Sequence, residues 1–322
     1  MISESKTDKQ PLVSIGLPVY NGEQFLDQTL DSLRNQDLSS LELIISDNGS
    51  TDRTPMICQD HQADDRRIRY YRNTANLGAI KNFNRAFELA SGTYFMWAGD
   101  HDLWDQSYVT KCISILEDDP TAVLAYSRTM LVDIEGNPIG LMPDQIDTRG
   151  ITSPSERYLN LIRNLRWGNM VYGVIRSEAL KQTGLLKNVF GPDHLLLAEL
   201  SLKGTFAQIS EPLFFRRRNR PTEDVDRDAE AWKLQAIKTL DPGDSHNWRE
   251  ATLSDLYRSL RNEHLRLIRS CSSSRREKLK MVLETLKWYD SDFGVGWPGG
   301  PLLQRLCTNR FSDSLLTRIG VS

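Results

Sequence analysis

The first hundred residues alternate between short apolar runs and amphipathic stretches. Four runs are rich in β-forming side chains, and each ends in a polar loop: 13–17, 41–46, 68–71 and 93–97. Between these runs, apolar residues recur at the three- and four-residue spacing of a buried helix face. The resulting order, β-α-β-α-β-α-β, predicts right-handed crossovers and a parallel sheet. We therefore expect an α/β fold.

Local turn chemistry predicts where the first helices begin and end. Asn21 is expected in a turn, where it can also act as a helix N-cap. Thr54 followed by Pro55 is typical of an N-cap and the first helical residue. Gly92 is expected to end the helix that opens at Gly78.

Beyond residue 105 the pattern is less regular. The expected helices are 108–116, a segment ending at 166, and 195–203. The expected strands are 122–126, 131–133, 139–141, 170–175, 205–209 and 213–215. After an acidic stretch at 222–228, the sequence predicts helices at 229–240, 248–268 and 275–288 and a loop at 291–301. This change of character predicts an α/β domain at 1–220 and a helical C-terminal region at 221–322.

Composition places the chain among ordinary globular proteins. Its 322 residues carry a formal net charge of −3, so no overall positive field favours nucleic acid. Four scattered cysteines without a Cys-x-x-Cys pair are typical of reduced thiols in the cytoplasm. The polar first ten residues are not typical of a signal peptide or a membrane anchor. The sequence has neither Gly-x-Gly-x-x-Gly after its first strand nor Gly-x-x-x-x-Gly-Lys-Ser/Thr, which disfavours a dinucleotide dehydrogenase and a P-loop NTPase.

Polar loops follow all four strands: 20–22, 47–52, 72–78 and 99–102. Ligands of open α/β sheets bind at the carboxyl ends of the strands, so these loops are expected to line one crevice. The apolar run 93–97 leads directly into Asp100, His101 and Asp102. Two carboxylates one residue apart can bind one Mg²⁺ or Mn²⁺ ion. An Asp-x-Asp pair by itself more often marks a solvated acidic turn.

Six segments occur in an order that carries more information than any one of them. They are Pro18-Val19-Tyr20-Asn21, Asp47-Asn48-Gly49-Ser50-Thr51-Asp52, Asn76-Leu77-Gly78, Asp100-His101-Asp102, Gly191-Pro192-Asp193 and Pro212-Leu213-Phe214-Phe215-Arg216-Arg217. This ordered set resembles the inverting glycosyltransferases of family 2, which have the GT-A fold. The resemblance implies a mixed sheet flanked by helices and a nucleotide-diphosphate sugar as donor. It also implies a sugar or lipid-linked glycan as acceptor, as in polysaccharide or glycoconjugate biosynthesis.

The resemblance implies roles for individual residues. The nucleotide pocket would contain Pro18, Tyr20, Asn21, Asp47, Asn76, Gly78 and Asp100. Asp47 would accept a hydrogen bond from the imide N–H of the base. Asp100 and Asp102 would bind the Mn²⁺ or Mg²⁺ ion that bridges the diphosphate. Asp193 would be the general base that takes the proton of the acceptor hydroxyl; its alternative role is to cap the helix that it precedes.

Other side chains have two interpretations each. The stretch 216–220 is either a phosphate clamp or a solvated basic segment that faces the acids at 223–228. Glu199 faces either the acceptor or the solvent. The aromatic candidates for stacking on sugar rings, which are otherwise core residues, are Trp104, Trp167 and Tyr172.

The helix predicted at 248–268 has an apolar face and a basic face. Its apolar face contains Leu253, Leu256, Leu260 and Leu267. Such a helix either lies on an anionic membrane, here at its cytoplasmic face, or packs on its own domain or on a second subunit in a homodimer.

Two alternative functions also remain at this point. One is a catalytically silent module that binds a nucleotide sugar or a partner, and the other is a sugar-1-phosphate nucleotidyltransferase.

Overall fold

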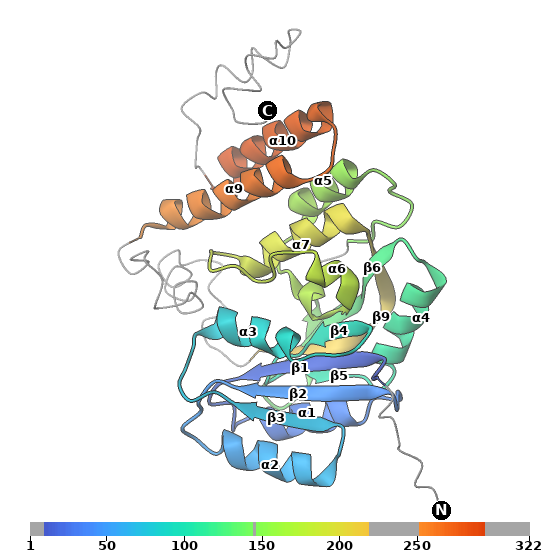
Figure 1. The fold of residues 1–322 in the computed structure, drawn as a ribbon, viewed down its shortest axis with the longest axis vertical. Helices are drawn as coiled ribbons and strands as arrows, with labels where there is room; N and C mark the ends of the chain where they lie inside the picture. The colour runs from blue at the N-terminus through green and yellow to red at the C-terminus, as the bar shows by residue number, and fades with distance from the viewer. Residues whose placement is uncertain (1–9, 144–145, 219–250, 294–322) are drawn as a thin grey trace, which may run out of the picture.

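A computed structural model describes residues 10–143, 146–218 and 251–293 (Figure 1). Its first half alternates strands and helices as the sequence predicts: β1 (Val13–Val19), α1 (Leu26–Arg34), β2 (Leu41–Asp47), α2 (Thr54–Asp64), β3 (Ile68–Arg72), α3 (Ala79–Glu88) and β4 (Tyr94–Trp97). The four strands are parallel in the order β3-β2-β1-β4. Every residue of β1, β2 and β4 is buried, because α3 covers one face of the sheet and α1 and α2 cover the other (Figure 1).

The second half completes a mixed sheet. Its elements are β5 (Leu103–Trp104), α4 (Tyr108–Asp118), β6 (Ala122–Val132), β7 (Pro138–Leu141), α5 (Pro154–Asn164), η1 (Asn169–Tyr172), β8 (Val174–Arg176), α6 (Ser177–Lys181), α7 (Pro192–Lys203) and β9 (Thr205–Arg217). β8 is antiparallel to β4 and to β6, whereas β9 is parallel to β6. Within the described residues the strand order is β3-β2-β1-β4-β8-β6-β9-β5, with β7 paired to β6. The predicted mixed sheet flanked by helices is confirmed.

Three strand predictions differ from the structure. The predicted strands 122–126 and 131–133 are one strand, β6, which pairs with β9 along its whole length. The segment 170–175 begins with the 3-10 turn η1, and only Val174–Arg176 form strand β8. Gly168, with φ +67°, turns the chain just before η1, so the apolar side chains that follow are buried without joining the sheet. The predicted strands 205–209 and 213–215 are one strand, β9. Its register against β6 shifts next to Pro212, and such an irregularity accommodates a proline within a strand.

Three helix-end predictions are off by a few residues. Thr54 is the first residue of α2 rather than its cap, and its N–H donates to the Asp52 carboxylate at 3.0 Å. Asn21 lies five residues before α1, with φ +53°, and therefore belongs to the preceding loop. α3 ends four residues before Gly92. A Cβ at Gly92 would lie 2.6 Å from the backbone nitrogen of Ser14, so glycine is needed there for a close backbone approach.

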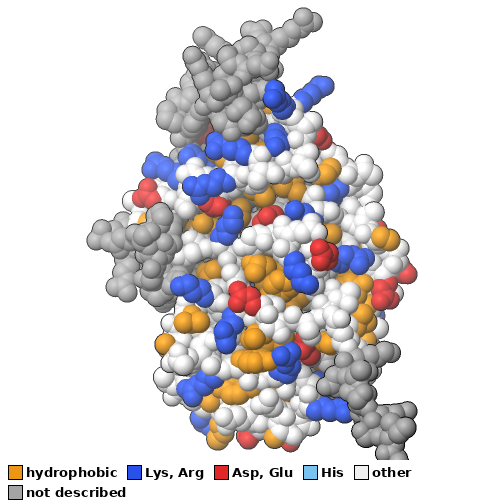
Figure 2. All heavy atoms as spheres, in the orientation of Figure 1, with side chains coloured by type: hydrophobic (Ala, Val, Ile, Leu, Met, Phe, Trp, Pro, Cys, Tyr) orange, Lys and Arg blue, Asp and Glu red, His pale blue; other side chains and the backbone are white. Residues whose placement is uncertain are grey.

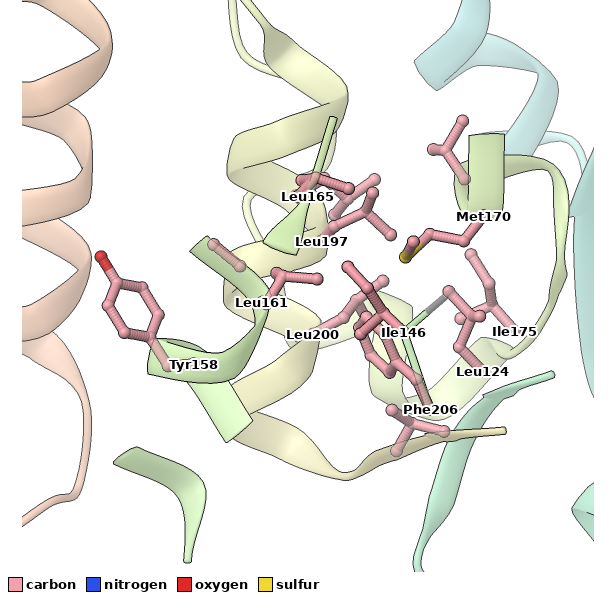
Figure 3. Close-up of a cluster of buried hydrophobic side chains, with 14 of the residues drawn as sticks. Leu124, Ile146, Tyr158, Leu161, Leu165, Met170, Ile175, Leu197, Leu200 and Phe206 are labelled. Atoms are coloured by element: carbon pink, nitrogen blue, oxygen red, sulfur yellow. The ribbon is translucent and has the colours of Figure 1, made fainter. Parts of the chain in front are cut away.

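A large apolar core lies between the sheet and helices α5 and α7. Leu161 of α5 and Leu165, just after its end, face Leu197 and Leu200 of α7, and Phe206 of β9 joins the same cluster (Figure 3). Each of these side chains is at most 5% exposed. Because burying one such side chain contributes roughly 1.5–3 kcal/mol, this cluster fixes α7 firmly against the sheet.

Two further helices, α9 (Leu253–Ser270) and α10 (Arg275–Phe293), lie side by side beyond α5 and α7 (Figure 1). Leu256 and Leu260 are 0% and 3% exposed, so the apolar face of α9 packs on its own chain. Arg258 and Arg266 are exposed, and Figure 2 shows Lys and Arg side chains over this end of the molecule. The structure thus confirms a helical C-terminal region.

α10 continues to Phe293, into the stretch predicted as a loop from residue 291. The predicted helix at 229–240 and the acidic segment 222–228 lie outside the described residues. In the part of the chain that the structure describes, no helix is both long and apolar enough to cross a membrane.

Candidate active site

The loops after β1 and β2 are joined by hydrogen bonds at the carboxyl edge of the sheet. The backbone N–H of Asn21 donates to Ser50 Oγ at 2.9 Å, and the N–H of Thr51 donates to Asn21 Oδ1 at 2.8 Å. Pro18 lies in β1 beside β2, and Tyr20 projects from the loop with 45% of its surface exposed. The structure therefore brings the predicted residues Pro18, Tyr20 and Asn21 to one place.

Asp47 ends β2 but is not exposed to the crevice. Its side chain is completely buried, with Oδ1 accepting from the Ser50 N–H at 2.8 Å and Oδ2 accepting from the Tyr70 hydroxyl at 2.7 Å. Arg72 Nε lies 3.3 Å from Oδ2. Burial of Tyr70 and its hydrogen bond to Asp47 raise the pKa of its hydroxyl. The hydroxyl therefore stays protonated and acts as the donor. Asp47 thus holds the loop that it begins, and its contact with a nucleobase stays a prediction.

Asn48 connects this loop to the one before α3. Its Nδ2 donates to Asn76 Oδ1 at 2.8 Å, and its Oδ1 accepts from the Leu77 N–H at 2.9 Å. Asn76 Oδ1 also accepts from the Gly78 N–H at 2.9 Å, and Gly78 has φ +89°, which favours glycine. The predicted residues Asn76 and Gly78 lie together. Sequence reasoning assigned no role to Asn48, although it stands inside the motif that begins at Asp47.

The acidic turn after β4 lies beside the first loop. A Cβ at Gly22 would lie 3.0 Å from Asp100 Oδ2, so glycine makes room for this carboxylate. His101 Nδ1 lies 2.8 Å from Asp100 Oδ1. Asp102 is 1% exposed, and its Oδ1 accepts from the Arg217 backbone N–H at 2.9 Å. Burial raises the pKa of Asp102, and the positive charge of His101 acts in the opposite direction.

These two carboxylates fit part of the coordination shell of a divalent cation. Among the described residues, no group of three or more His, Cys, Asp or Glu side chains could by itself hold a metal ion. Mg²⁺ is commonly bound by one or two carboxylates together with water and substrate phosphates. Two carboxylates of this kind would leave the remaining positions of a bound cation to water or to phosphate oxygens.

Asp193 lies in the first turn of α7. The helix begins at Pro192 and its N-cap is Gly191, so Asp193 is not the cap. A carboxylate at this position is favoured by the partial positive charge of a helix N-terminus. A Cβ at Gly168 would lie 2.6 Å from Asp193 Oδ2. Gly168 thus provides the space in which the carboxylate is held.

The two acidic elements lie near each other. Burial raises the pKa of the Tyr172 hydroxyl, and the charges of Asp102, Asp193 and Asp100 raise it further, whereas Arg216 lowers it. Asp193 lies against Gly168, the neighbouring Asn169 accepts from Arg216, and the Arg217 N–H donates to Asp102, so direct contacts join the two acidic elements. The structure brings together the turn after β4, the start of α7 and the end of β9.

The basic stretch at 216–218 divides into residues with different surroundings. Arg216 Nη1 donates to Asn169 Oδ1 at 2.7 Å on the side of Tyr172. Arg217 is 1% exposed and donates to Gln28 Oε1 at 2.8 Å, away from the site. Arg218 continues the pairing with β6, and 219–220 lie outside the described residues. Of the two arginines whose side-chain contacts are described, Arg216 lies on the side of the site, and its contact with a phosphate stays a prediction.

Three of the other candidates make structural contacts, whereas Trp167 is partly exposed and its stacking on a sugar stays a prediction. Trp104 is 4% exposed and stacks on Phe214 with ring centroids 5.1 Å apart, so it is a core residue. Tyr172 also packs on Phe214, at 5.6 Å. Glu199 accepts a hydrogen bond from the Gly184 N–H at 3.0 Å and so fixes the turn before α7.

Comparisons with known proteins agree with this geometry. Residues 14–165 match the family described as Glycosyl transferase family 2. An uncharacterized glycosyltransferase of Haemophilus influenzae is 28% identical over 211 residues, which are 63% of this chain and 64% of that protein. The GalNAc(5)-diNAcBac-PP-undecaprenol beta-1,3-glucosyltransferase of Campylobacter jejuni is 25% identical over 198 residues, 61% of this chain and 62% of that protein. The chain thus matches less than two thirds of the length of these relatives.

A solved structure supports the fold. The crystal structure of S. aureus TarS 1-349 in complex with UDP is similar at a TM-score of 0.61 and 15% sequence identity, covering 96% of this chain and 78% of that one. The mixed sheet and its flanking helices define a protein of the GT-A fold, the fold expected from the motifs. Residues 14–165, just under half of the chain, thus resemble glycosyl transferase family 2 in sequence.

Proposed function

We propose that this protein is a metal-dependent inverting glycosyltransferase that moves a sugar from a nucleoside-diphosphate donor to a glycan or lipid-linked acceptor. The observation that carries the proposal is the chain of contacts that joins Asp193 to Asp102: Asp193 lies against Gly168, the neighbouring Asn169 accepts from Arg216, and the Arg217 N–H donates to Asp102. An inverting displacement needs charge neutralisation at the leaving group and a base at the acceptor. The two acidic elements supply one candidate for each.

The donor would occupy the crevice at the carboxyl ends of β1, β2 and β4. The exposed ring of Tyr20 and the Nδ2 of the exposed Asn76, whose Oδ1 already accepts two hydrogen bonds, are the groups offered to the nucleoside. Asp47 and Asn48 hold the loops on which these groups stand. A nucleoside diphosphate as part of the donor is supported by the likeness to TarS, which was solved with UDP.

Asp193 takes the proton of the acceptor hydroxyl as that oxygen forms its bond to the anomeric carbon. The bond between the anomeric carbon and the diphosphate breaks, and the diphosphate leaves with the electron pair. Asp100 and Asp102 would hold a Mn²⁺ or Mg²⁺ ion, which supplies Lewis-acid neutralisation of the leaving diphosphate. Arg216, held by Asn169, adds positive charge near Asp102.

Two separate observations bear on the acceptor and on the place where the enzyme acts. The name of the Campylobacter jejuni relative includes a PP-undecaprenol-linked glycan, which favours a lipid-linked acceptor for this protein. Cys58 and Cys112 are buried free thiols, as is usual in the cytoplasm. The enzyme would then act from the cytoplasm on an acceptor at the inner face of the membrane.

Thermal unfolding with UDP, GDP, dTDP and CMP, each with and without Mn²⁺, tests the donor site. A ligand at a hundredfold excess over its Kd adds about 2.7 kcal/mol, so one nucleoside diphosphate should raise the Tm by several degrees, and only with metal. Asp102→Asn should abolish this shift and keep the unliganded Tm, because the amide oxygen still accepts the Arg217 N–H. A metal-independent shift would contradict the role of Asp102. If none of the nucleotides shifts the Tm, the donor site is refuted.

A further inference from the structure

The start of α7 is packed against the C-terminal helices. Three side chains around Asp193 form a cluster with three from α9 and α10: Val189, Phe190 and Leu195 with Leu256, Leu260 and Tyr289. Each of the six is at most 7% exposed. This cluster is separate from the two larger cores of the sheet. The backbone on both sides of Asp193 is therefore anchored on α9 and α10.

The closest contacts between this segment and α9 lie just before Asp193. The rings of Phe190 and Tyr257 meet edge to face with centroids 5.0 Å apart. A Cβ at Gly191 would lie 3.4 Å from Leu260 Cδ2, so Leu260 lies directly over this glycine. Gly191 has φ +62° and is the N-cap of α7. A movement of Leu260 would thus act on the residue that sets the entry into the helix carrying Asp193.

The preceding residues are tied at two further points. Lys187 Nζ lies 3.1 Å from Glu263 Oε2 on α9. The backbone of Leu186 exchanges two hydrogen bonds with the amide of Asn84 on α3, at 2.9 and 3.1 Å. α3 begins next to Gly78, in the donor crevice. The segment that leads to Asp193 is therefore held between α3 and α9.

We infer that Leu260 and Tyr257 are positioning residues for the general base. By fixing Phe190 and Gly191 they set the place of the Asp193 carboxylate relative to the acceptor, and α9 becomes part of the transferase site. The inference rests on the proposed function of Asp193. A displacement of about 1 Å at a reacting group can cost on the order of a hundredfold in rate, so a small change in packing here is measurable in turnover.

Leu260→Ala in the full chain tests the inference. The variant should lower kcat by about tenfold or more, and should keep the KM for the donor and the nucleotide-dependent Tm shift, because the donor crevice is untouched. Leu260→Met, which conserves volume, should restore kcat. Leu286→Ala on α10 is the matched control, since Leu286 is 8% exposed in the other core cluster. It should lose comparable stability and retain kcat when all variants are assayed well below their Tm.

A combination with Asp193→Asn separates the inference from the proposed function. Adding Leu260→Ala to Asp193→Asn should lower the residual rate no further, since the displaced group is already inactive. If Leu260→Ala keeps wild-type kcat while Asp193→Asn loses it, the inference fails and the proposed function stands. If Asp193→Asn keeps full kcat, the proposed function fails. Equal losses in Leu260→Ala and Leu286→Ala would show a general effect of core packing and overturn the inference.

Discussion

The roles of the neighbouring residues Arg216 and Arg217 depend on the face of β9 to which each side chain points. Successive side chains of a strand point to opposite faces. Arg217 points into the protein, where it donates to Gln28 and lies over the ring of Phe25 at 4.3 Å. Arg216 points to Asn169 and the site. The sequence predicts a basic stretch but does not separate the two, because the partners of Arg217 belong to the first helix and its cap.

Alanine substitutions of these arginines should have opposite effects. Arg217→Ala leaves a cavity and deprives Gln28 Oε1 and the Ile134 carbonyl of a donor, so it should lower the free energy of unfolding by about 2–4 kcal/mol. Arg216→Ala should change stability by less than about 1 kcal/mol and lower turnover clearly. Urea unfolding and a transfer assay measure the two effects. Equal stability losses would contradict the division of roles.

The candidate site could be predicted in part at this scale. Asp100, Asp102 and Asp193 were identified because each follows a recognisable end of an element and matches a family motif. The enclosure of Asp47 could not be predicted, because its partner Tyr70 comes from a neighbouring strand whose register the sequence does not specify. A motif thus identifies a residue, while its exposure depends on long-range packing.

At the scale of elements, the prediction is most accurate where local and global patterns agree. β1 to β4 and their helices have regular spacing, so their order and the parallel sheet were predicted correctly. The run at 170–175 has strand propensity, but Gly168 and the tertiary packing turn half of it into η1. The contacts between α5, α9 and α10 also have no sequence signature. Tyr158, His264 and Thr285 form a buried polar group there, with distances of 2.9 and 3.0 Å.

His264 should make the stability of this helical packing depend on pH. Burial, with the charge of His194, lowers its pKa from 6.5 to about 3. The unfolded chain therefore binds a proton below pH 6.5 that the folded chain does not, so stability is complete above 6.5 and falls as the pH falls toward 3. The loss is about 1.4 kcal/mol per pH unit at most. Urea unfolding between pH 7 and 5 should show this slope in the wild type and a flatter one in His264→Gln. Identical slopes would contradict the assignment.

At the scale of the whole molecule, the site lies where two halves of the sheet meet. The parallel half, β1 to β4, supplies the loops of the donor crevice and the Asp100–Asp102 turn. β8 pairs antiparallel with β4, and η1, which directly precedes β8, packs against β4. α7 and the C-terminal helices then hold Asp193 on the other side of η1. The sequence predicts each half but not their junction, because short antiparallel strands such as β8 have little periodicity of their own.

In the proposed reaction, Asp193 activates an acceptor for transfer from a nucleotide sugar. The most direct measurement is release of nucleoside diphosphate from a panel of nucleotide sugars, with Mn²⁺ and lipid-linked glycan acceptors, in the wild type and in Asp193→Asn. We expect acceptor-dependent release from one donor in the wild type and a loss of at least about a hundredfold in the variant, with Tm and nucleotide binding unchanged. Equal release by both proteins would contradict this role of Asp193.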